Sequence, residues 1–230
     1  MPDFVFPPAP VATVPVDDGR LFPVRRIFCV GRNYAAHALE MGGAPEREPP
    51  FFFTKPADAI VTGGADVHYP TETANLHHEM ELVIAIGTAG ADIVETDALH
   101  HIFGYAAGID LTRRDLQDEA KAARRPWDMS KGFDHSAPIG AIAPAARIGH
   151  PAKGAIELTV DGTPRQSSDI SLMIWSIPEI VAHLSRLVRL EAGDLIFTGT
   201  PEGVGAVKVG ETMVGKIEGV GTVTAKIVGR

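Results

Sequence analysis

The chain has 230 residues, of which 45% are hydrophobic and 22% charged, the composition of an ordinary globular protein with a substantial core. Its formal net charge is −8 and the sequence has no basic block, which argues against nucleic acid and anionic membrane surfaces as partners. No apolar run approaches the roughly 20 residues that span a bilayer, and the N-terminus carries no recognisable secretory signal. The single cysteine, Cys29, argues against a disulfide scaffold and favours a reducing compartment, so we expect a cytoplasmic location.

The N-terminal region is rich in proline. Residues 1–23 are predicted to form an extended arm, which either packs on the body or frays because proline-rich segments have no internal hydrogen bonds. Residues 24–230 are predicted to form one domain. The apolar run at residues 27–30 predicts a short buried strand, which Gly31 ends.

A short helix is predicted over residues 33–42, with Asn33 as its N-cap. His37 and Glu40 are three residues apart, so they share one face of this helix. As an exposed pair they would be unremarkable. A carboxylate that orients an imidazole is also a common form of general base, because it fixes the tautomer and stabilises the imidazolium as it forms.

The segment that follows is polar and proline-rich. Residues 44–50 are typical of a mobile lid or hinge. Residues 51–55, which include three consecutive phenylalanines, then predict a buried strand that Pro56 stops. Lys55 at the end of this strand faces either a pocket or solvent.

An acidic strand is predicted from Glu79 onward. Alternation places Glu79 and Glu81 on one face, about 7 Å apart, and the larger aliphatic residues up to Ile86 on the other. Two carboxylates in an apolar run both stay ionised only if a cation lies between them; the alternative is a solvated pair at a strand end. His77 and His78 precede the strand and suggest a rival, a facial-triad iron site. Because adjacent residues point to opposite faces, at most one of these histidines can join the glutamates.

A third carboxylate, Asp110, follows the apolar run 105–109 and precedes a helix predicted over residues 112–125. Residues at the end of a strand commonly carry chemistry. Arg114 and Gln117 share one face of the helix, so both can face a pocket near the carboxylates or lie on a solvated surface.

Lys131 lies in a loop among aromatic and acidic residues, where it could neutralise a developing enolate or be an ordinary surface lysine. The glycine-rich loop at 198–205 lacks the features of a phosphate cradle, but its backbone amides and the Thr200 hydroxyl could hold a carboxylate. The other predicted elements are a hairpin over residues 156–166, an amphipathic helix over residues 176–188, a buried strand over residues 194–197 and a hairpin over residues 211–228.

Four motifs give the chain a recognisable resemblance. Residues 29–37 (CVGRNYAAH), 77–82 (HHEMEL), 110–117 (DLTRRDLQ) and 198–205 (TGTPEGVG) resemble the fumarylacetoacetate hydrolase family. The match runs in the expected order from about residue 24 to the C-terminus and is closest to the short, acylpyruvase-like branch.

This resemblance implies an α+β fold that is β-rich, with mixed sheets rolled into a barrel-like β-sandwich and few helices, assembled as a homodimer. It also implies a divalent cation, Mg²⁺ or Mn²⁺, held by Glu79, Glu81 and Asp110. The donor chemistry agrees, because an all-carboxylate set suits a hard cation.

The implied reaction is hydrolysis of a carbon–carbon bond in a small anionic 2-oxo acid. His37, oriented by Glu40, would activate water, and Lys131 would stabilise the pyruvate enolate that leaves. The residues implied to hold oxygens of the substrate or intermediate are Arg32, Arg114, Gln117 and Thr200.

The expected substrate is fumarylpyruvate, an intermediate of aromatic compound catabolism, because residues 48–58 and 129–135 are similar to enzymes named for it. The same site chemistry serves hydrolysis of acetylpyruvate, tautomerisation or decarboxylation of oxaloacetate, and isomerisation of muconate-type acids. The alternative outside enzymes is a catalytically silent protein that binds metal and dicarboxylates.

Overall fold

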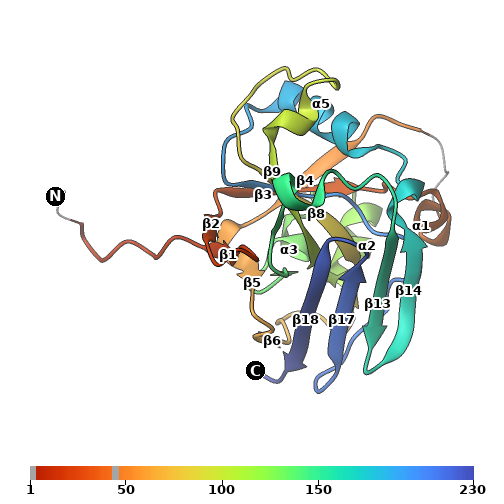
Figure 1. The fold of residues 1–230 in the computed structure, drawn as a ribbon. Coiled ribbons are helices and arrows are strands. Elements are labelled where there is room, and N and C mark those ends of the chain that lie inside the picture. Colours follow the sequence, from red (N-terminus) through yellow and green to blue (C-terminus); the bar gives the residue numbers. More distant parts are fainter. Residues whose placement is uncertain (1–3, 43–46) are drawn as a thin grey trace.

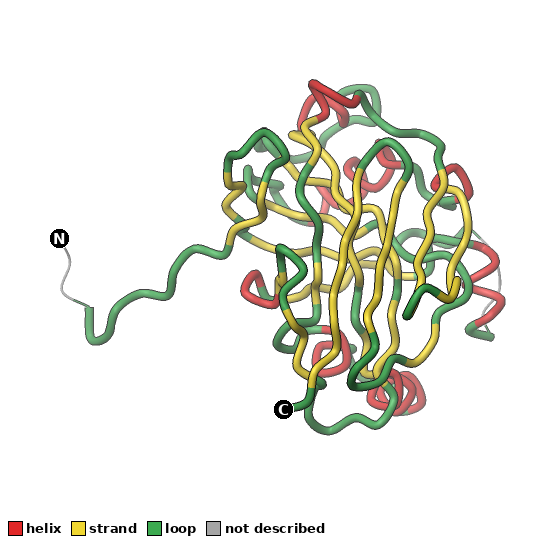
Figure 2. Tube along the Cα trace, turned by 60° about the horizontal axis from the view of Figure 1, so that its bottom comes forward, coloured by secondary structure: helices red, strands yellow, loops and turns green. Residues whose placement is uncertain are grey.

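The computed structural model describes residues 4–42 and 47–230. The described chain is an α+β, sheet-rich protein (Figures 1 and 2). One large sheet has six strands in the order β12 (Ala143–Pro144), β9 (Ile102–Ile109), β8 (Met80–Ile86), β15 (Asp194–Phe197), β3 (Arg26–Gly31) and β4 (Phe51–Lys55). The other has five, in the order β14 (Thr163–Asp169), β13 (Ala155–Val160), β17 (Thr212–Ile217), β18 (Gly221–Val228) and β6 (Asp66–His68).

Smaller elements connect and cover these sheets. The short strands are β1 (Thr13–Pro15), β2 (Leu21–Pro23), β5 (Ile60–Val61), β7 (Leu76–His78), β10 (Thr112–Arg113), β11 (Ala137–Pro138) and β16 (Gly205–Ala206). The α-helices are α1 (Ala35–Glu40), α2 (Arg114–Ala122), α3 (Asp128–Lys131), α4 (Ala145–Ile148) and α5 (Ile177–Leu187), and the 3₁₀ turns are η1 (Ala57–Ala59), η2 (Ala98–His101) and η3 (Ile170–Leu172).

The acidic strand β8 lies in the middle of the six-stranded sheet, between β9 and β15. It pairs antiparallel with both neighbours, and all seven of its residues are buried. The register sets Met80 opposite Ile109. The start of β8 therefore meets the end of β9, where Asp110 follows.

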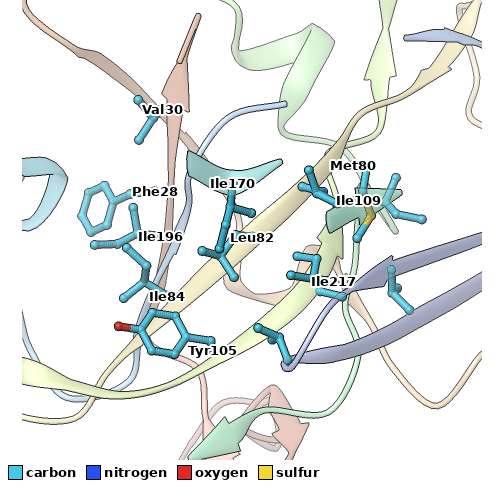
Figure 3. Close-up of a cluster of buried hydrophobic side chains, with 14 of the residues drawn as sticks. Phe28, Val30, Met80, Leu82, Ile84, Tyr105, Ile109, Ile170, Ile196 and Ile217 are labelled. Carbon is cyan, nitrogen blue, oxygen red and sulfur yellow. The ribbon is translucent and has the colours of Figure 1, made fainter. Parts of the chain in front are cut away.

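Alternation along β8 separates two hydrophobic clusters, as the sequence predicts. Leu82 and Ile84 point into the main core between the two large sheets, where they pack near Tyr105 of β9 and Ile217 of β17 (Figure 3). Val83 and Ala85 point to the opposite face. A period of two therefore puts Glu81 on that opposite face as well.

The second cluster is covered by the N-terminal hairpin. Strands β1 and β2 pair with each other, and Val14 and Phe22 are buried against the far face of the six-stranded sheet. Residues 13–23 of the predicted arm therefore pack on the body, where they form a hairpin whose apolar side chains cover the sheet. Residues 4–12 do extend from the body (Figure 1).

The predicted hairpins are confirmed. β13 and β14 form the first, with Asp161 and Gly162 both at positive φ in the turn, and β17 and β18 form the C-terminal one (Figure 1). Helix α5 begins after Ser176, whose capping box with Glu179 is complete.

Helix α1 corrects one prediction. Its N-cap is Tyr34, not Asn33. The Asn33 side chain instead bonds the backbone of two other segments. Its Nδ2 donates to Trp175 O at 3.0 Å and to Thr198 O at 2.8 Å, and its Oδ1 accepts from Trp175 N at 2.7 Å. These tertiary bonds occupy the amide, so it cannot also cap the helix.

The two large sheets do not close into a barrel within the described residues. Each ends in edge strands, so the predicted barrel-like closure is not observed there. The lid predicted over residues 44–50 falls partly on residues 43–46, which lie outside the described part of the chain. Among residues 4–42 and 47–230, no helix combines the length and apolar character required to cross a bilayer.

Candidate metal and acid–base site

Three carboxylates meet where β8 begins and β9 ends. Glu79, Glu81 and Asp110 are buried, and one ligating oxygen from each lies within 4.8 Å of the other two. The sheet register produces this arrangement, because Asp110 N donates to Glu79 O at 2.8 Å and so extends the pairing of the two strands. The grouping predicted from sequence is therefore present.

Buried cations surround this carboxylate cluster. Lys131 Nζ lies 2.7 Å from Glu79 Oε2, from Asp110 Oδ2 and from the Thr112 hydroxyl. Arg114 pairs with the other Glu79 oxygen. Lys131 is thus not the surface lysine of the alternative reading, and the face of α2 that carries Arg114 is turned inward.

Lys55 is a further buried cation at the cluster. Its Nζ lies 2.8 Å from Asp110 Oδ1 and donates to Leu111 O at 3.1 Å and to Lys131 O. The strand pairing of β4 with β3 carries it there. Of the two orientations left open by the sequence, the structure shows the inward one.

The charges shift the pKa values of Glu79, Glu81 and Lys131 in different directions. Burial opposes ionisation of Glu79, but the charges of Lys131 and Arg114 outweigh it and hold the pKa of Glu79 below its usual range. Burial, reinforced by the neighbouring carboxylates, raises the pKa of Glu81 well above its usual range. The pKa of Lys131 is raised, because its carboxylate partners outweigh its own burial.

Glu81 is the carboxylate that lacks a full counter-charge. Its Oε2 accepts a hydrogen bond of 2.7 Å from Gly199 N, in the glycine-rich loop. A backbone N–H carries only a partial charge, which does not offset burial beside two other carboxylates. A bound dication would supply the missing positive charge.

The imidazole of His37, on α1, lines the same cavity as Glu79 and Glu81. Its Nδ1 is 3.1 Å from Glu40 Oε2, and Glu40 is held in turn by Gly203 N at 3.1 and 3.3 Å. The predicted pair is therefore formed and anchored to the glycine-rich loop. With Nδ1–H donated to Glu40, His37 Nε2 is left as the nitrogen that can accept a proton.

One cavity brings the predicted residues together. It is lined by Arg32, His37, Glu79, Glu81, Arg114, Gln117, Lys131 and Thr200, eight of the ten residues expected at the site. The other two, Glu40 and Asp110, contact the cavity through His37 and Lys131. Lys121, Trp127, Met41 and Phe53 also line it and are absent from the sequence prediction.

The two histidines of the rival iron site are engaged elsewhere. His77 Nε2 lies 2.9 Å from Asn75 Oδ1, and His78 Nδ1 lies 3.0 Å from Gln166 Oε1. Burial, reinforced by the charge of Arg114, lowers the pKa of His77 to about 4. Within the described residues, the group of potential ligands consists of carboxylates only, which favours a hard cation over iron.

Fold and site together define a mixed-sheet protein with an all-carboxylate centre and a separate imidazole–carboxylate pair in one cavity. The family model described as "Fumarylacetoacetate (FAA) hydrolase C-terminal" matches residues 26–228, and the chain belongs to this family.

Similar proteins include hydrolases and an oxaloacetate tautomerase. A crystal structure of fumarylpyruvate hydrolase from Pseudomonas aeruginosa, in complex with Mn²⁺ and pyruvate, is 52% identical with a TM-score of 0.97 and covers 99% of this chain and 100% of its own. Fumarylpyruvate hydrolase of Ralstonia sp is 45% identical over 78% of this chain and 93% of its own. Mitochondrial oxaloacetate tautomerase of Homo sapiens is 41% identical over 88% of this chain and 91% of its own.

Proposed function

We propose that the chain is a hydrolase, dependent on Mg²⁺ or Mn²⁺, that cleaves fumarylpyruvate to fumarate and pyruvate. The observation that carries this proposal is the position of the His37–Glu40 pair in the same cavity as the three buried carboxylates. The similarity to the Pseudomonas aeruginosa enzyme, whose structure holds Mn²⁺ and pyruvate, supports the reaction and the metal.

Glu79, Glu81 and Asp110 would hold the cation. Their carboxylate oxygens converge, and the raised pKa of Glu81 marks an unmet requirement for positive charge. When bound, a dication supplies Lewis acidity and a template for the two oxygens of a 2-oxo acid. Arg114 and Gln117, which bond each other beside Glu79, would hold further oxygens of the substrate.

His37 would act as the general base. Glu40 keeps the hydrogen of the ring on Nδ1, so Nε2 takes a proton from water and the water oxygen attacks the distal carbonyl carbon. The carbon–carbon bond then breaks, and its electron pair goes to the pyruvate fragment as an enolate. The proton held by His37 returns to this enolate, which becomes pyruvate.

Lys131 would stabilise the enolate. Its side chain is 2% exposed, and a charge held away from water stabilises a developing anion better than a solvated one. Arg32 and Thr200 line the same cavity and would hold the remaining oxygens.

The test is release of pyruvate from fumarylpyruvate and from acetylpyruvate, followed by coupled reduction of the product, with Mn²⁺ or with EDTA. Release that depends on metal and favours fumarylpyruvate is expected. His37→Ala should abolish it while binding Mn²⁺ normally, whereas His100→Ala, on the exposed part of η2, should leave it unchanged. Unchanged turnover in His37→Ala would remove this residue from the mechanism.

Oxaloacetate tautomerisation is the second candidate, because relatives with that name cover most of the chain at 41% identity. Interconversion of enol and keto forms needs acid–base groups but no attack by water. A purified protein that interconverts the two forms of oxaloacetate, yet releases no pyruvate from either acylpyruvate, would establish this function in place of hydrolysis. Decarboxylation is distinguished in the same assay by release of carbon dioxide.

We further infer a homodimer from the family resemblance, and a cytoplasmic location from the single cysteine. Light scattering on the purified chain tests the first inference. A mass equal to one 24.4 kDa chain at all concentrations would exclude the dimer.

A further inference from the structure

Gln166, a residue that the reaction does not use directly, connects the acidic strand to the glycine-rich loop. Gln166 lies on β14, and its side chain is buried. Its Oε1 lies 3.0 Å from Met80 N and 3.0 Å from His78 Nδ1. Its Nε2 lies 2.9 Å from both the Thr200 hydroxyl and the carbonyl oxygen of Pro201.

Two backbone groups fix the orientation of this amide. The N–H of Met80 can only donate, and the carbonyl of Pro201 can only accept. Oxygen must therefore face Met80 and nitrogen must face Pro201, because the reversed amide would set two buried donors together and two buried acceptors together.

The same reasoning fixes the tautomer of His78. The ring nitrogen that faces Gln166 Oε1 must carry the hydrogen, so Nδ1 is protonated. The other ring nitrogen, Nε2, is buried and has no hydrogen-bond partner among the described residues.

For Thr200 the consequence is a defined polarity. The hydroxyl has one hydrogen, and it already accepts the hydrogen that Gln166 donates. Its own hydrogen is therefore free to point into the cavity that Thr200 lines together with His37 and Lys131.

We propose that Gln166 is a positioning residue, which holds the Thr200 hydroxyl as a donor toward the ligand and thereby selects an anionic oxygen at that point. This inference rests on the proposed function, since the anionic oxygen belongs to the 2-oxo acid or to its enolate. A ligand group that presents a hydrogen there meets a second donor and is rejected.

Oxalate is the probe, because it offers two adjacent carboxylates and does not react. Its affinity for the full chain with saturating Mn²⁺ is measured by calorimetry. Thr200→Val should weaken binding by about 10- to 100-fold, the effect of one hydrogen bond to a charged group, whereas Thr200→Ser should retain it. Gln166→Glu turns the Thr200 hydrogen away from the ligand once its buried carboxylate is ionised. Oxalate affinity should therefore fall with rising pH more steeply in this variant than in the unaltered protein, and at alkaline pH it should be as weak as in Thr200→Val.

Two comparisons distinguish positioning from general damage. The double variant Gln166→Glu/Thr200→Val should bind oxalate no more weakly than Thr200→Val alone, because both changes remove the same donor. Affinity for Mn²⁺ without oxalate should stay the same in every variant. Additive losses, or full affinity in Gln166→Glu at alkaline pH, would overturn the proposal.

The tautomer of His78 provides a test on the unaltered protein, which does not depend on the folding of any variant. Nitrogen NMR of the histidine-labelled chain, assigned with His78→Gln, should show hydrogen on Nδ1 of His78. A Nδ1 without hydrogen would mean that the amide of Gln166 is reversed and would overturn the assignment. Failure of the unaltered protein to bind oxalate with Mn²⁺ would instead overturn the proposed function, and this inference with it.

Discussion

Lys131→Met should destabilise the metal-free protein far more than the removal of another lysine from the same cavity. Lys131 is 2% exposed, and its ammonium contacts Glu79, Asp110 and Thr112 at 2.7 Å each. Removing one partner of a buried ion pair leaves uncompensated charge and costs about 3–5 kcal/mol. For a chain of this length each kcal/mol lowers Tm by about 2–4 °C, so Tm should fall by about 6–20 °C.

The matched control is Lys121→Met. The Lys121 side chain is 27% exposed, and its nearest carboxylate, on Asp118, lies 3.5 Å away at the surface of α2. Pairs of this kind contribute about 0–1 kcal/mol, so the control should unfold within a few degrees of the unaltered protein.

Thermal unfolding is recorded in EDTA and again with saturating Mn²⁺. The metal should restore most of the Tm lost in Lys131→Met, because a dication held by Glu79, Glu81 and Asp110 replaces the missing positive charge. Equal losses in Lys131→Met and Lys121→Met would refute the charge argument. A loss that Mn²⁺ does not reduce would show that the three carboxylates do not hold the cation.

Three further predictions follow from the same geometry. Because the pKa of Glu81 is raised, the folded metal-free protein keeps a proton that the unfolded chain releases. The free energy of unfolding, measured with urea, should therefore fall by about 1.4 kcal/mol per pH unit above the usual carboxyl pKa. Glu81→Gln or Mn²⁺ should abolish this slope. Gly199 has φ +96°, and a Cβ there would lie 2.7 Å from the Asn33 side chain, whereas Gly210 has φ +97° and open space around it. Gly199→Ala should therefore weaken both stability and Mn²⁺ binding more than Gly210→Ala does. Equal effects of the two substitutions would contradict this reasoning. Glu40→Gln should lower turnover by roughly 10²–10⁴-fold with Mn²⁺ affinity unchanged, since Glu40 bonds His37 and Gly203 N but none of the three carboxylates. Parallel loss of metal would show a structural role.

The metal half of the site could be predicted because local rules determine it. A period of two sets Glu79 and Glu81 on one face of β8, and strand pairing brings Asp110 to them. Helical spacing likewise places His37 beside Glu40. Each of these contacts joins residues that are a few positions apart or lie on one pair of strands. The spacing of the residues in the sequence is therefore enough to predict them.

The partners that depend on distant segments could not be predicted. Lys55 reaches Asp110 from an edge strand, and nothing in residues 51–55 distinguishes an inward from an outward lysine. Gln166 reads as one polar residue of a hairpin, and its contacts to His78 and Thr200 arise only when the two large sheets pack. Asn33 satisfies the composition rule for an N-cap but binds the backbone of residues 175 and 198.

The carboxylates of the site lie on and beside the central strand β8, whereas His37 and Glu40 lie on the short helix α1. The two parts should therefore differ in how readily they unfold locally. β8 lies between two paired strands with every residue buried, so its amides should exchange with deuterium only when the whole molecule unfolds. Helix α1 has six residues, and Glu40 at its end is about one-third exposed, so its amides should exchange through low-energy local openings. Mild urea should therefore abolish catalysis while the carboxylates still hold their cation, and the enzyme would pass through a state that is loaded but inactive.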